Sequence, residues 1–403
     1  MSELYQLPAG WEWKKLNDIV RFGCEKGFQP QIINDMVPFI GMSNIDESKG
    51  RETTYTLEKY ESVSNGKTKF QKGAILVGKI TPCTQNNKVS IVPNEINGGF
   101  ATTEVFALHC FEDMLPLFLN YFIRSKKINN YLVSTMIGAT GRQRIPTDIL
   151  KNLGIPVPAL TEQKRIVQKL DALFERIDKA IALLQKNISA ADNFMNSVLN
   201  DVFSDLEQNF NIVELSEIVS KLGDGLHGTP KYDESGEYYF INGANIKDGE
   251  IVVNDNTKKV NLEEYKKYRK ELNDRTILVS INGTIGNVGI YNNEKCILGK
   301  SACYFNLLDG VDKIYVTYVI KSDSFQEYIR NNATGATIKN VSLKTMRESK
   351  LVIPPLKIQQ KVVAYLDNIS AQIEQVKSAQ QQKMQSLLNL KSSILDQAFH
   401  GKL

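Results

Sequence analysis

The chain has 403 residues, 42% of them hydrophobic and 23% charged, which is the composition of an ordinary globular protein and excludes extensive disorder. No run of about 18 apolar residues occurs, so we expect no membrane helix and no membrane partner. The five cysteines are scattered and odd in number, which indicates free thiols in a reducing cytoplasm. The net charge of +4 permits an acidic partner such as DNA without requiring one.

Residues 1–158 alternate short β-branched runs with turns. Ala74 to Val77 and Val89 to Val92 are typical of strands, and Asn97-Gly-Gly99 is typical of a turn. We therefore expect a first domain that is a mixed α/β globule with a substantial sheet.

Two polar segments of this globule carry side chains suited to reading DNA, Lys79 to Lys88 and Gly141 to Arg144. Reading base edges in the major groove needs Lys, Arg, Asn or Gln on protruding loops, whereas phosphate contacts only position the protein. A solvated loop with no contact is the alternative for each segment. The candidate contacts are Lys79, Thr81, Gln85, Asn86, Lys88, Arg142, Gln143 and Arg144.

A long helix is expected over residues 159–204. Ile155-Pro-Val-Pro158 precedes it, and no Gly or Pro interrupts it. Apolar residues recur at steps of four and three, which is the seam of a coiled coil, and an extra step of four at Ile181 unwinds the seam locally. The expected pairing positions are Ile166, Leu170, Leu173, Ile177 and Leu184.

A second mixed α/β globule is expected over residues 205–355. Thr276 to Ile281 is strand-like, and Asn282-Gly283 is a turn. A Gly-rich loop over residues 224–231 is a further candidate for contact, although its histidine is more often a surface residue than a contact. The candidate DNA contacts of this globule are His227, Thr229, Lys231, Asn282, Thr284, Thr337, Lys339 and Asn340.

Residues 356–403 are expected to form a second long helix after the stop Ile353-Pro354-Pro355. Two seam positions, Gln380 and Lys383, are polar; such residues cost stability and fix register, so a defined pairing is indicated. The expected pairing positions here are Val362, Leu366, Ile369, Ile373 and Leu387.

The chain is one unit written twice. Leu160-Thr-Glu-Gln163 returns 196 residues later as Leu356-Lys-Ile-Gln359, and Tyr121 to Ser125 matches Tyr318 to Ser322. Helices of roughly 40 residues would each span about 60 Å. We expect them to pack antiparallel as a rod that separates two similar globules in pseudo-twofold relation, a symmetry that suits duplex DNA.

The order of several motifs resembles one known family, the specificity subunits of type I restriction-modification systems. The opening Leu7-Pro8-x-Gly10-Trp11 is one such motif, and the closing Ala398-Phe399-x-Gly401-x-Leu403 is another. Between them, each globule ends with Gly-Ala-Thr, at 138–140 and 335–337, followed by the proline stop and the start of the long helix. The resemblance covers essentially the whole chain.

This resemblance implies a fold and a function. The globules would be target recognition domains, each reading one half of a bipartite, asymmetric DNA sequence. The helices would space the half-sites and dock two adenine-N6 methyltransferase subunits, and motor/endonuclease subunits would join for restriction. S-adenosylmethionine, ATP and Mg would then bind to those partners and no cofactor to this chain. The second copy has Ile358 and Gln360 where the first has Glu162 and Lys164, so the two docking surfaces need not be equivalent.

No catalytic residue and no metal ligand is predicted. Gly299-Lys300-Ser301 ends like a phosphate-binding loop, but Glu294 stands where the required glycine would be. Asp255 with Glu264 and Lys266 has the loose spacing of a nuclease site, which arises readily by chance in a lysine-rich helix. The five scattered cysteines and three histidines form no metal-binding pattern, and no glycine-rich loop for S-adenosylmethionine follows a predicted strand.

Three alternatives remain open. A structural coiled-coil scaffold without DNA reading would not require polar loops on both globules. A specificity partner of a fused methylase-nuclease would be separated from the main interpretation only by the identity of the neighbouring subunit. A stand-alone enzyme is disfavoured by the missing donor, metal and nucleotide motifs.

Overall fold

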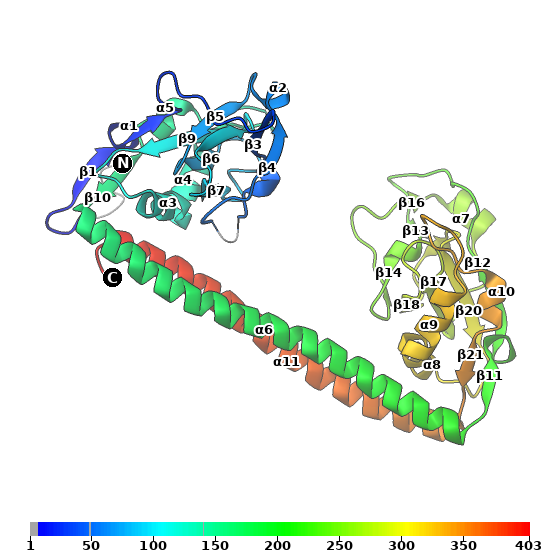
Figure 1. The fold of residues 1–403 in the computed structure, drawn as a ribbon. Helices are drawn as coiled ribbons and strands as arrows, with labels where there is room; N and C mark the ends of the chain where they lie inside the picture. Colours follow the sequence, from blue (N-terminus) through cyan, green and yellow to red (C-terminus); the bar gives the residue numbers. More distant parts are fainter. Residues whose placement is uncertain (1–6, 48–49, 140) are drawn as a thin grey trace. The chain divides into compact units, whose positions relative to one another are not determined.

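A computed structural model describes residues 7–47, 50–139 and 141–403 (Figure 1). The chain divides into two compact units, one formed by residues 1–184 with 382–403 and the other by residues 185–381. Each unit combines a globule with parts of two long helices, α6 (Leu160–Asn209) and α11 (Leu356–Phe399). The expected mixed α+β class with two long helices is confirmed. Helix α6 ends five residues beyond the expected boundary at 204, because its last turns pack into the second globule.

The first globule is built on two four-stranded sheets and one strand pair. The sheets have the orders β2-β9-β6-β7 and β4-β3-β8-β5, and β1 pairs with β10. Only β3 and β8 run parallel among these described pairs. The strands are β1 (Glu12–Lys15), β2 (Val20–Phe22), β3 (Met36–Ile40), β4 (Thr56–Lys59), β5 (Thr68–Gln71), β6 (Ile75–Gly78), β7 (Val89–Ile91), β8 (Gly98–Ala101), β9 (Val105–Cys110) and β10 (Gly154–Val157).

The second globule repeats the main sheet, the parallel strand pair and the terminal strand pair of the first, but its second sheet has three strands. Its main sheet has the order β12-β20-β17-β18, and parallel β13 and β19 match β3 and β8. Strand β16 flanks β13, β11 pairs with β21, and β14 pairs with β15. The strands are β11 (Ile212–Glu214), β12 (Val219–Asp224), β13 (Tyr238–Ile241), β14 (Ile246–Lys247), β15 (Glu250–Ile251), β16 (Lys259–Val260), β17 (Thr276–Ser280), β18 (Val288–Ile290), β19 (Cys296–Leu298), β20 (Ala302–Leu307) and β21 (Lys350–Val352).

Short helices complete each globule. In the first they are α1 (Leu16–Ile19), η1 (Met42–Asn44), α2 (Tyr60–Val63), α3 (Pro116–Arg124), α4 (Lys126–Ser134) and α5 (Thr147–Lys151). In the second they are η2 (Leu215–Glu217), η3 (Gly243–Asn245), α7 (Leu262–Tyr268), α8 (Lys313–Lys321), α9 (Asp323–Asn331) and α10 (Leu343–Arg347). The order α8, α9, α10 repeats the order α3, α4, α5.

The pairing registers align the two globules residue by residue. Ile75 in β6 pairs with Leu108 in β9, and Ile277 in β17 pairs with Phe305 in β20. The same comparison holds for the parallel strands, because Ile40 pairs with Ala101 and Ile241 with Leu298. The repeat found in the sequence is therefore a repeat of the fold.

The core of each unit joins its globule to the long helices. In the first unit, the buried ring of Phe399 at the end of α11 lies 5.3 Å from the ring of Phe118 and 5.0 Å from that of Phe122. In the second, Phe203 of α6 lies 5.8 Å from Tyr315 of α8. Phe203 and Phe399 are 196 residues apart, the spacing of the repeat.

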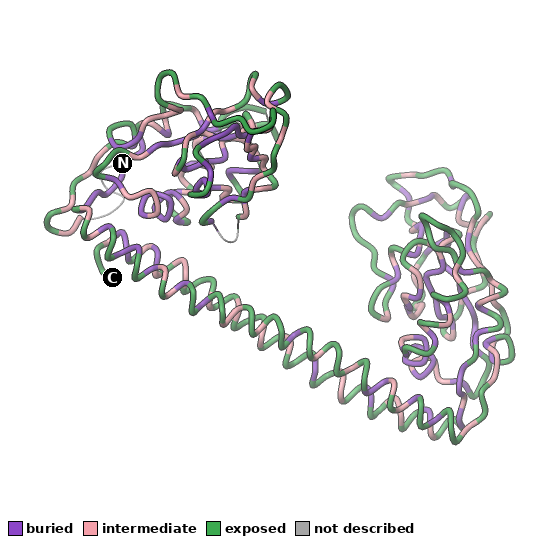
Figure 2. The backbone as a smooth tube through the Cα atoms, viewed as in Figure 1, coloured by how far each residue is buried: buried purple, intermediate pink, exposed green. Residues whose placement is uncertain are grey.

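Within each unit the two long helices pair antiparallel. Lys391 of α11 forms an ion pair with Asp178 of α6 at 2.7 Å in the first unit, and Lys377 pairs with Asp192 at 3.0 Å in the second. Buried positions gather toward the two ends of each helix, as Figure 2 shows, since only there do the helices also pack against globule residues. The middle turns contribute few buried side chains.

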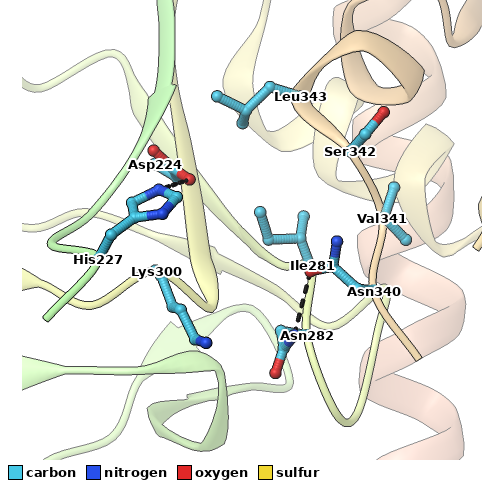
Figure 3. A pocket seen from close by; sticks show the side chains of 9 residues that line it. All are labelled: Asp224, His227, Ile281, Asn282, Lys300, Asn340, Val341, Ser342 and Leu343. Carbon is cyan, nitrogen blue, oxygen red and sulfur yellow. Dashed lines mark hydrogen bonds and ion pairs between the residues drawn. The ribbon is translucent and has the colours of Figure 1, made fainter. Parts of the chain in front are cut away.

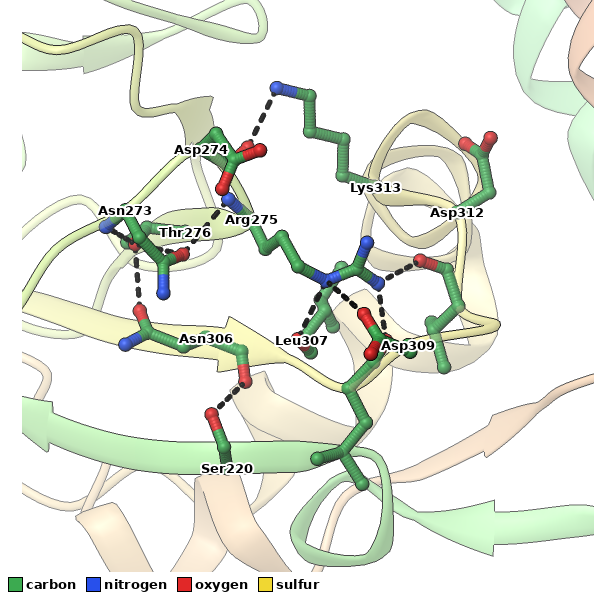
Figure 4. A network of polar contacts seen from close by, with 12 residues as sticks. Ser220, Asn273, Asp274, Arg275, Thr276, Asn306, Leu307, Asp309, Asp312 and Lys313 are labelled. Carbon is green, nitrogen blue, oxygen red and sulfur yellow. Dashed lines mark hydrogen bonds and ion pairs between the residues drawn. The ribbon is translucent and has the colours of Figure 1, made fainter.

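A polar network supports the main sheet of the second globule (Figure 4). The buried Asn306 amide accepts from the Thr276 hydroxyl at 2.7 Å and donates to the Glu271 carbonyl at 2.8 Å. The Arg275 guanidinium donates to the carbonyl oxygens of Leu307 and Val311, both at 2.9 Å. These bonds satisfy buried polar groups where β20 leads into α8.

Candidate nucleic-acid interface

The two predicted reading segments of the first globule form one surface. The 79–88 loop connects β6 to β7, and the 141–144 segment belongs to a tight turn between α4 and α5. The Thr81 backbone N–H donates to the Gln143 carbonyl at 3.0 Å, and the Ile145 N–H donates to the Lys79 carbonyl at 2.9 Å. Main-chain bonds thus hold two segments together that are about 60 residues apart in the sequence.

The candidate side chains of this surface differ in what they are free to contact. Gln85, Asn86, Arg142 and Arg144 are exposed. Neither guanidinium makes a hydrogen bond or an ion pair with a described residue. Both are available to an anionic partner, and a pair of such cations beside amide side chains suits a DNA backbone and groove.

The other four candidates of this globule are engaged within the fold. The Thr81 hydroxyl and the Gln143 main chain bond to each other, and the Lys88 ammonium donates to the Met42 carbonyl at 2.8 Å. Lys79 lies over the ring of Phe106 at 5.2 Å, and burial, with the nearby Arg144 charge, lowers the pKa of its ammonium. These residues shape the surface, and their donors are partly used inside the chain.

The second globule builds the same arrangement from different residues. The Gly283 N–H donates to the Lys339 carbonyl at 2.9 Å, and the Val341 N–H donates to the Ile281 carbonyl at 2.8 Å. The loop after β17 is shorter: Ser280 bonds to Asn287, whereas the equivalent bond in the first globule joins Gly78 to Lys88. Predicted contacts at 282–284 and 337–340 are therefore brought together, as they are in the first globule.

Glycine is required at the turn of both segments. Gly138 and Gly335 have φ values of 127° and 98°. A Cβ at Gly335 would lie 2.2 Å from the Ile338 carbonyl oxygen, and one at Gly138 would lie 2.8 Å from that of Arg142. The glycine of the repeated Gly-Ala-Thr motif thus has a steric origin. Thr140 of that motif lies outside the described residues.

A polar hollow of about 480 Å³ opens on this side of the second globule (Figure 3). His227 lies against Asp224, with the ring Nε2 2.6 Å from the carboxylate, and the Asn282 amide donates to the Asn340 amide oxygen at 3.1 Å. Lys300, in the turn that follows β19, also lines the hollow. Four segments distant in sequence thus supply donors and acceptors to one place.

The remaining candidates of this globule lie on exposed surface that does not line the hollow. Lys231 has an exposed side chain, and its backbone N–H donates to the Glu264 carboxylate at 2.9 Å. The others in this position are Thr229, Thr284, Thr337 and Lys339.

Lys300 is a residue that the sequence alone did not identify as a candidate contact. In the sequence it belongs to Gly299-Lys300-Ser301, which lacks the first glycine of a phosphate-binding loop. The Thr102 N–H bonds to the Ile40 carbonyl at 3.0 Å, and the Gly299 N–H bonds to the Ile241 carbonyl at 2.8 Å, so Lys300 takes the position of Thr103 in the first globule. An alignment of the two halves of the sequence on Ile40 and Ile241 would have placed Lys300 just beyond the end of a strand, at the surface.

Each globule is fastened to a long helix by the same buried glutamine. In the first unit the Gln163 amide accepts from Leu115 N–H at 2.8 Å and donates to the carbonyls of Asp113 and Pro158. Gln359 makes the equivalent bonds in the second unit, accepting from Asp312 N–H at 2.8 Å. The glutamine of the repeated helix start thus sets where the helix meets the globule.

A tyrosine and an aspartate form a second fastening. The Tyr121 hydroxyl donates to the Asp171 carboxylate at 2.5 Å, and Tyr318 donates to Asp367 at 2.7 Å. Burial and the bond to the carboxylate raise the pKa of both phenols above the usual range. Arg51 adds an ion pair to Asp171 at 2.6 Å in the first unit.

The predicted helix-pairing residues fall into two groups. Within the first unit, α6 positions pack with the end of α11, where Leu395 and Phe399 lie, and within the second unit the start of α11 packs with Val198 and Phe203 of α6. The buried or partly buried members in the first unit are Ile166, Leu170, Leu173, Ile177 and Leu387, and those in the second are Val362, Leu366, Ile369 and Ile373. Leu184 is half-buried and lies beside Leu387 and Leu390 on the helix pair.

Within residues 7–47, 50–139 and 141–403, no group of three or more His, Cys, Asp or Glu side chains is placed to hold a metal ion. All five cysteines are free, and burial raises the pKa of the Cys110 and Cys296 thiols to about 12. Across the same described ranges, no helix combines the length and the hydropathy that crossing a bilayer requires.

Comparison with known proteins identifies one family. Residues 8–186 and 207–383 match the model of the type I restriction modification DNA specificity domain, once for each half of the repeat. The EcoAI specificity subunit of a type I restriction enzyme from Escherichia coli is 30% identical over 224 residues, which are 55% of this chain and 37% of that subunit. The corresponding EcoEI subunit from Escherichia coli is 22% identical over 98% of this chain and 84% of its own length.

Solved structures share the fold. A chain from a structural study of the assembly and conformational transition of a type I R-M system superposes with a TM-score of 0.74 at 22% identity, covering 99% of this chain and all of its own. The crystal structure of the HsdS subunit from Thermoanaerobacter tengcongensis gives a TM-score of 0.54 at 22% identity, with complete coverage of both chains.

Proposed function

The chain belongs to the family of type I restriction modification DNA specificity domains, and from this premise we propose that it selects the DNA sequence for a type I restriction-modification complex. In this proposal residues 1–158 and 205–355 are the two target recognition domains. Residues 159–204 and 356–403 are the helices that space them and dock the partner subunits.

One observation carries the proposal. Both globules hold a loop and a glycine turn together with the same main-chain bonds, yet expose different side chains there. Arg142 and Arg144 present two cations in the first globule, whereas the second presents Lys339 beside the Asn282–Asn340 pair. Two unlike polar surfaces on one polypeptide suit a DNA target with two different halves.

The partners follow from the family. Specificity subunits are generally non-catalytic recognition subunits, so catalysis in the proposed complex belongs to two adenine-N6 methyltransferase subunits and to motor/endonuclease subunits. Those partners would bind S-adenosylmethionine, ATP and Mg, and the complex would act on DNA in the cytoplasm. The family match argues against a coiled-coil scaffold that reads no DNA.

The proposal is tested on the chain assembled with its methyltransferase. Mapping methylated adenines in the source genome gives the target, and gel-shift titration on that target measures affinity at several salt concentrations. Replacing Arg142→Ala together with Arg144→Ala should lower affinity about 10-fold to 100-fold and reduce the salt slope by about 1 to 2, because up to two phosphate contacts are lost.

A matched control removes the same charge from elsewhere on the first globule. Lys59 and Lys72 are exposed and lie outside both reading segments, so Lys59→Ala with Lys72→Ala should leave the salt slope unchanged. Unchanged affinity and slope for the double arginine variant would remove this surface from the interface. Methylation at a single uninterrupted sequence would contradict the two-part reading itself.

A further inference from the structure

The hollow of the second globule is lined by a hydrogen-bond acceptor, the Asp224 carboxylate, and by a donor, the Lys300 ammonium. Asp224 is the last residue of β12, where it pairs in register with Cys303, and its side chain is 18% exposed. Lys300 is exposed, and its ammonium makes no hydrogen bond or ion pair with any residue in the described ranges, Asp224 included. Figure 3 shows both side chains at the hollow.

Both residues are held by the main chain. The Lys300 N–H donates to the Leu226 carbonyl at 3.0 Å, and the Leu226 N–H donates in turn to the Leu298 carbonyl at 2.6 Å. The 224–227 turn and the 298–300 segment are therefore locked side by side. His227, at 2.6 Å from the Asp224 carboxylate, orients the acceptor without filling the hollow, since its own side chain is 71% exposed.

A G·C pair has the complementary pattern. In the major groove, guanine presents two acceptors, O6 and N7, and cytosine presents the N4 amino donor. Lysine is a preferred partner of guanine, and a carboxylate accepts from cytosine. A carboxylate repels phosphate, so the acceptor side of the hollow disfavours a DNA backbone contact there.

We propose that this hollow reads one G·C base pair of the DNA target, with Lys300 donating to guanine and Asp224 accepting from cytosine. The inference rests on the proposed function and assigns a base-reading role to two residues within it. Asn282 and Asn340 border the same hollow and read the neighbouring step.

At the two equivalent positions the first globule has neither a carboxylate nor an ammonium. Phe22 pairs with Leu108 and Leu222 with Phe305, so Cys24 takes the position of Asp224. Thr103 takes the position of Lys300. The G·C reading is therefore confined to the half-site of the second globule.

The test compares base preferences of the assembled methyltransferase. Every position of the mapped target is randomised, and bound sequences are selected and counted for the wild type, Lys300→Ala and Asp224→Asn. Lys300→Ala should lower the preference for G·C at one position of one half-site by about 10-fold, and Asp224→Asn should weaken it at that same position. Preferences in the other half-site should not change.

A charge-matched control is Lys266→Ala, which removes an exposed lysine of α7 that does not line the hollow. It should leave every preference as in the wild type. Because Lys300 is exposed, its replacement is compatible with folding, and the unchanged half-site reports directly that the complex is intact.

Two outcomes would overturn the inference. If Lys300→Ala weakens binding to all sequences equally and lowers the salt slope by about 1, Lys300 contacts phosphate. If the variant selects the same sequences as the wild type, the hollow reads nothing. Failure of the proposed function is distinct, since then the wild-type complex itself would show no two-part preference.

Discussion

The two globules agree in their buried framework and differ on the surface that the framework presents. Both have the same main-sheet order, the same parallel strand pair and the same bonds between the reading loop and the glycine turn. At equivalent surface positions, however, the first globule has Arg144 where the second has Asn340. It has Thr103 where the second has Lys300. The comparison teaches that main-chain bonds fix the shape of this surface, so its side chains are free to differ.

The framework residues differ little because each satisfies a buried group. Gln163 and Gln359 each make three hydrogen bonds to the main chain of the globule. An amide is needed because one atom must accept and the other must donate twice. The exposed Arg142 and Arg144 side chains of the predicted reading segments face no such requirement.

The largest expected effect on stability comes from removing the aromatic ring by which a long helix packs into the core of each globule. Phe399→Ala should destabilise the first unit, and Phe203→Ala the second, by about 3–5 kcal/mol each, because both rings are buried and a cavity remains. Amide hydrogen exchange read by mass spectrometry should show faster exchange in β6 and β9 for the first variant, and in β17 and β20 for the second.

Phe194 offers a control on the same helix as Phe203. Its side chain is 57% exposed, so Phe194→Ala should leave exchange in both globules unchanged. Equal acceleration in both globules by either ring variant would show that the two units do not unfold separately, which would break the comparison.

The next largest effect is expected from replacing Gln163 or Gln359, the buried glutamines that bond each globule to a long helix. Gln163→Ala should destabilise the first unit by about 2–4 kcal/mol, and Gln359→Ala should destabilise the second equally, since each leaves a buried N–H and two carbonyls without a partner. Urea denaturation followed by hydrogen exchange measures both.

Gln168→Ala, at an exposed position five residues further along α6, is the matched control and should have almost no effect. If only one of the two replacements lowered the free energy of unfolding, the two glutamines would contribute differently to stability although their hydrogen bonds are equivalent.

The smallest expected effect is a pH dependence of stability that arises from a histidine in the first unit and has no counterpart at the equivalent position of the second. Burial, together with the Arg21 charge, lowers the pKa of His109, whose Nε2 accepts from the Gln71 N–H at 3.0 Å. The equivalent residue in the second globule is Asn306, which does not titrate. The folded first unit therefore keeps His109 neutral at a pH where the unfolded chain takes up a proton.

The sign of the pH dependence follows. The unfolded state binds more protons below its pKa of about 6.5, so the free energy of unfolding of the first unit should fall as pH drops below that value, by at most about 1.4 kcal/mol per pH unit. Above about 6.5 the contribution is complete and constant. His109→Asn should remove this component, which urea titrations of both proteins at pH 5 and 7.5 would detect. An identical pH dependence in the two proteins would contradict it.

Much of the site could be anticipated, but not its assembly. The sequence placed Arg142 with Arg144 on one loop and Gln85 with Asn86 on another, and it could not show that Thr81 and Gln143 join those loops. It also predicted Lys88 as a contact, although the structure shows that its ammonium bonds to Met42, and it could not place Lys300 beside Asn282 and Asn340 at one hollow. Whether a donor forms a hydrogen bond within the fold depends on neighbours that are distant in the sequence.

The sequence by itself determined the duplication, the two long helices and the mixed α/β globules, because periodicity, proline stops and glycine turns are local signals that survive without tertiary context. Only the tertiary structure decided which polar residues share one surface, which α6 positions meet which α11 positions, and that Asp224 and Lys300 face a common hollow. Those facts rest on strand register and main-chain bonds between distant segments, and the residue types at each position do not encode them locally.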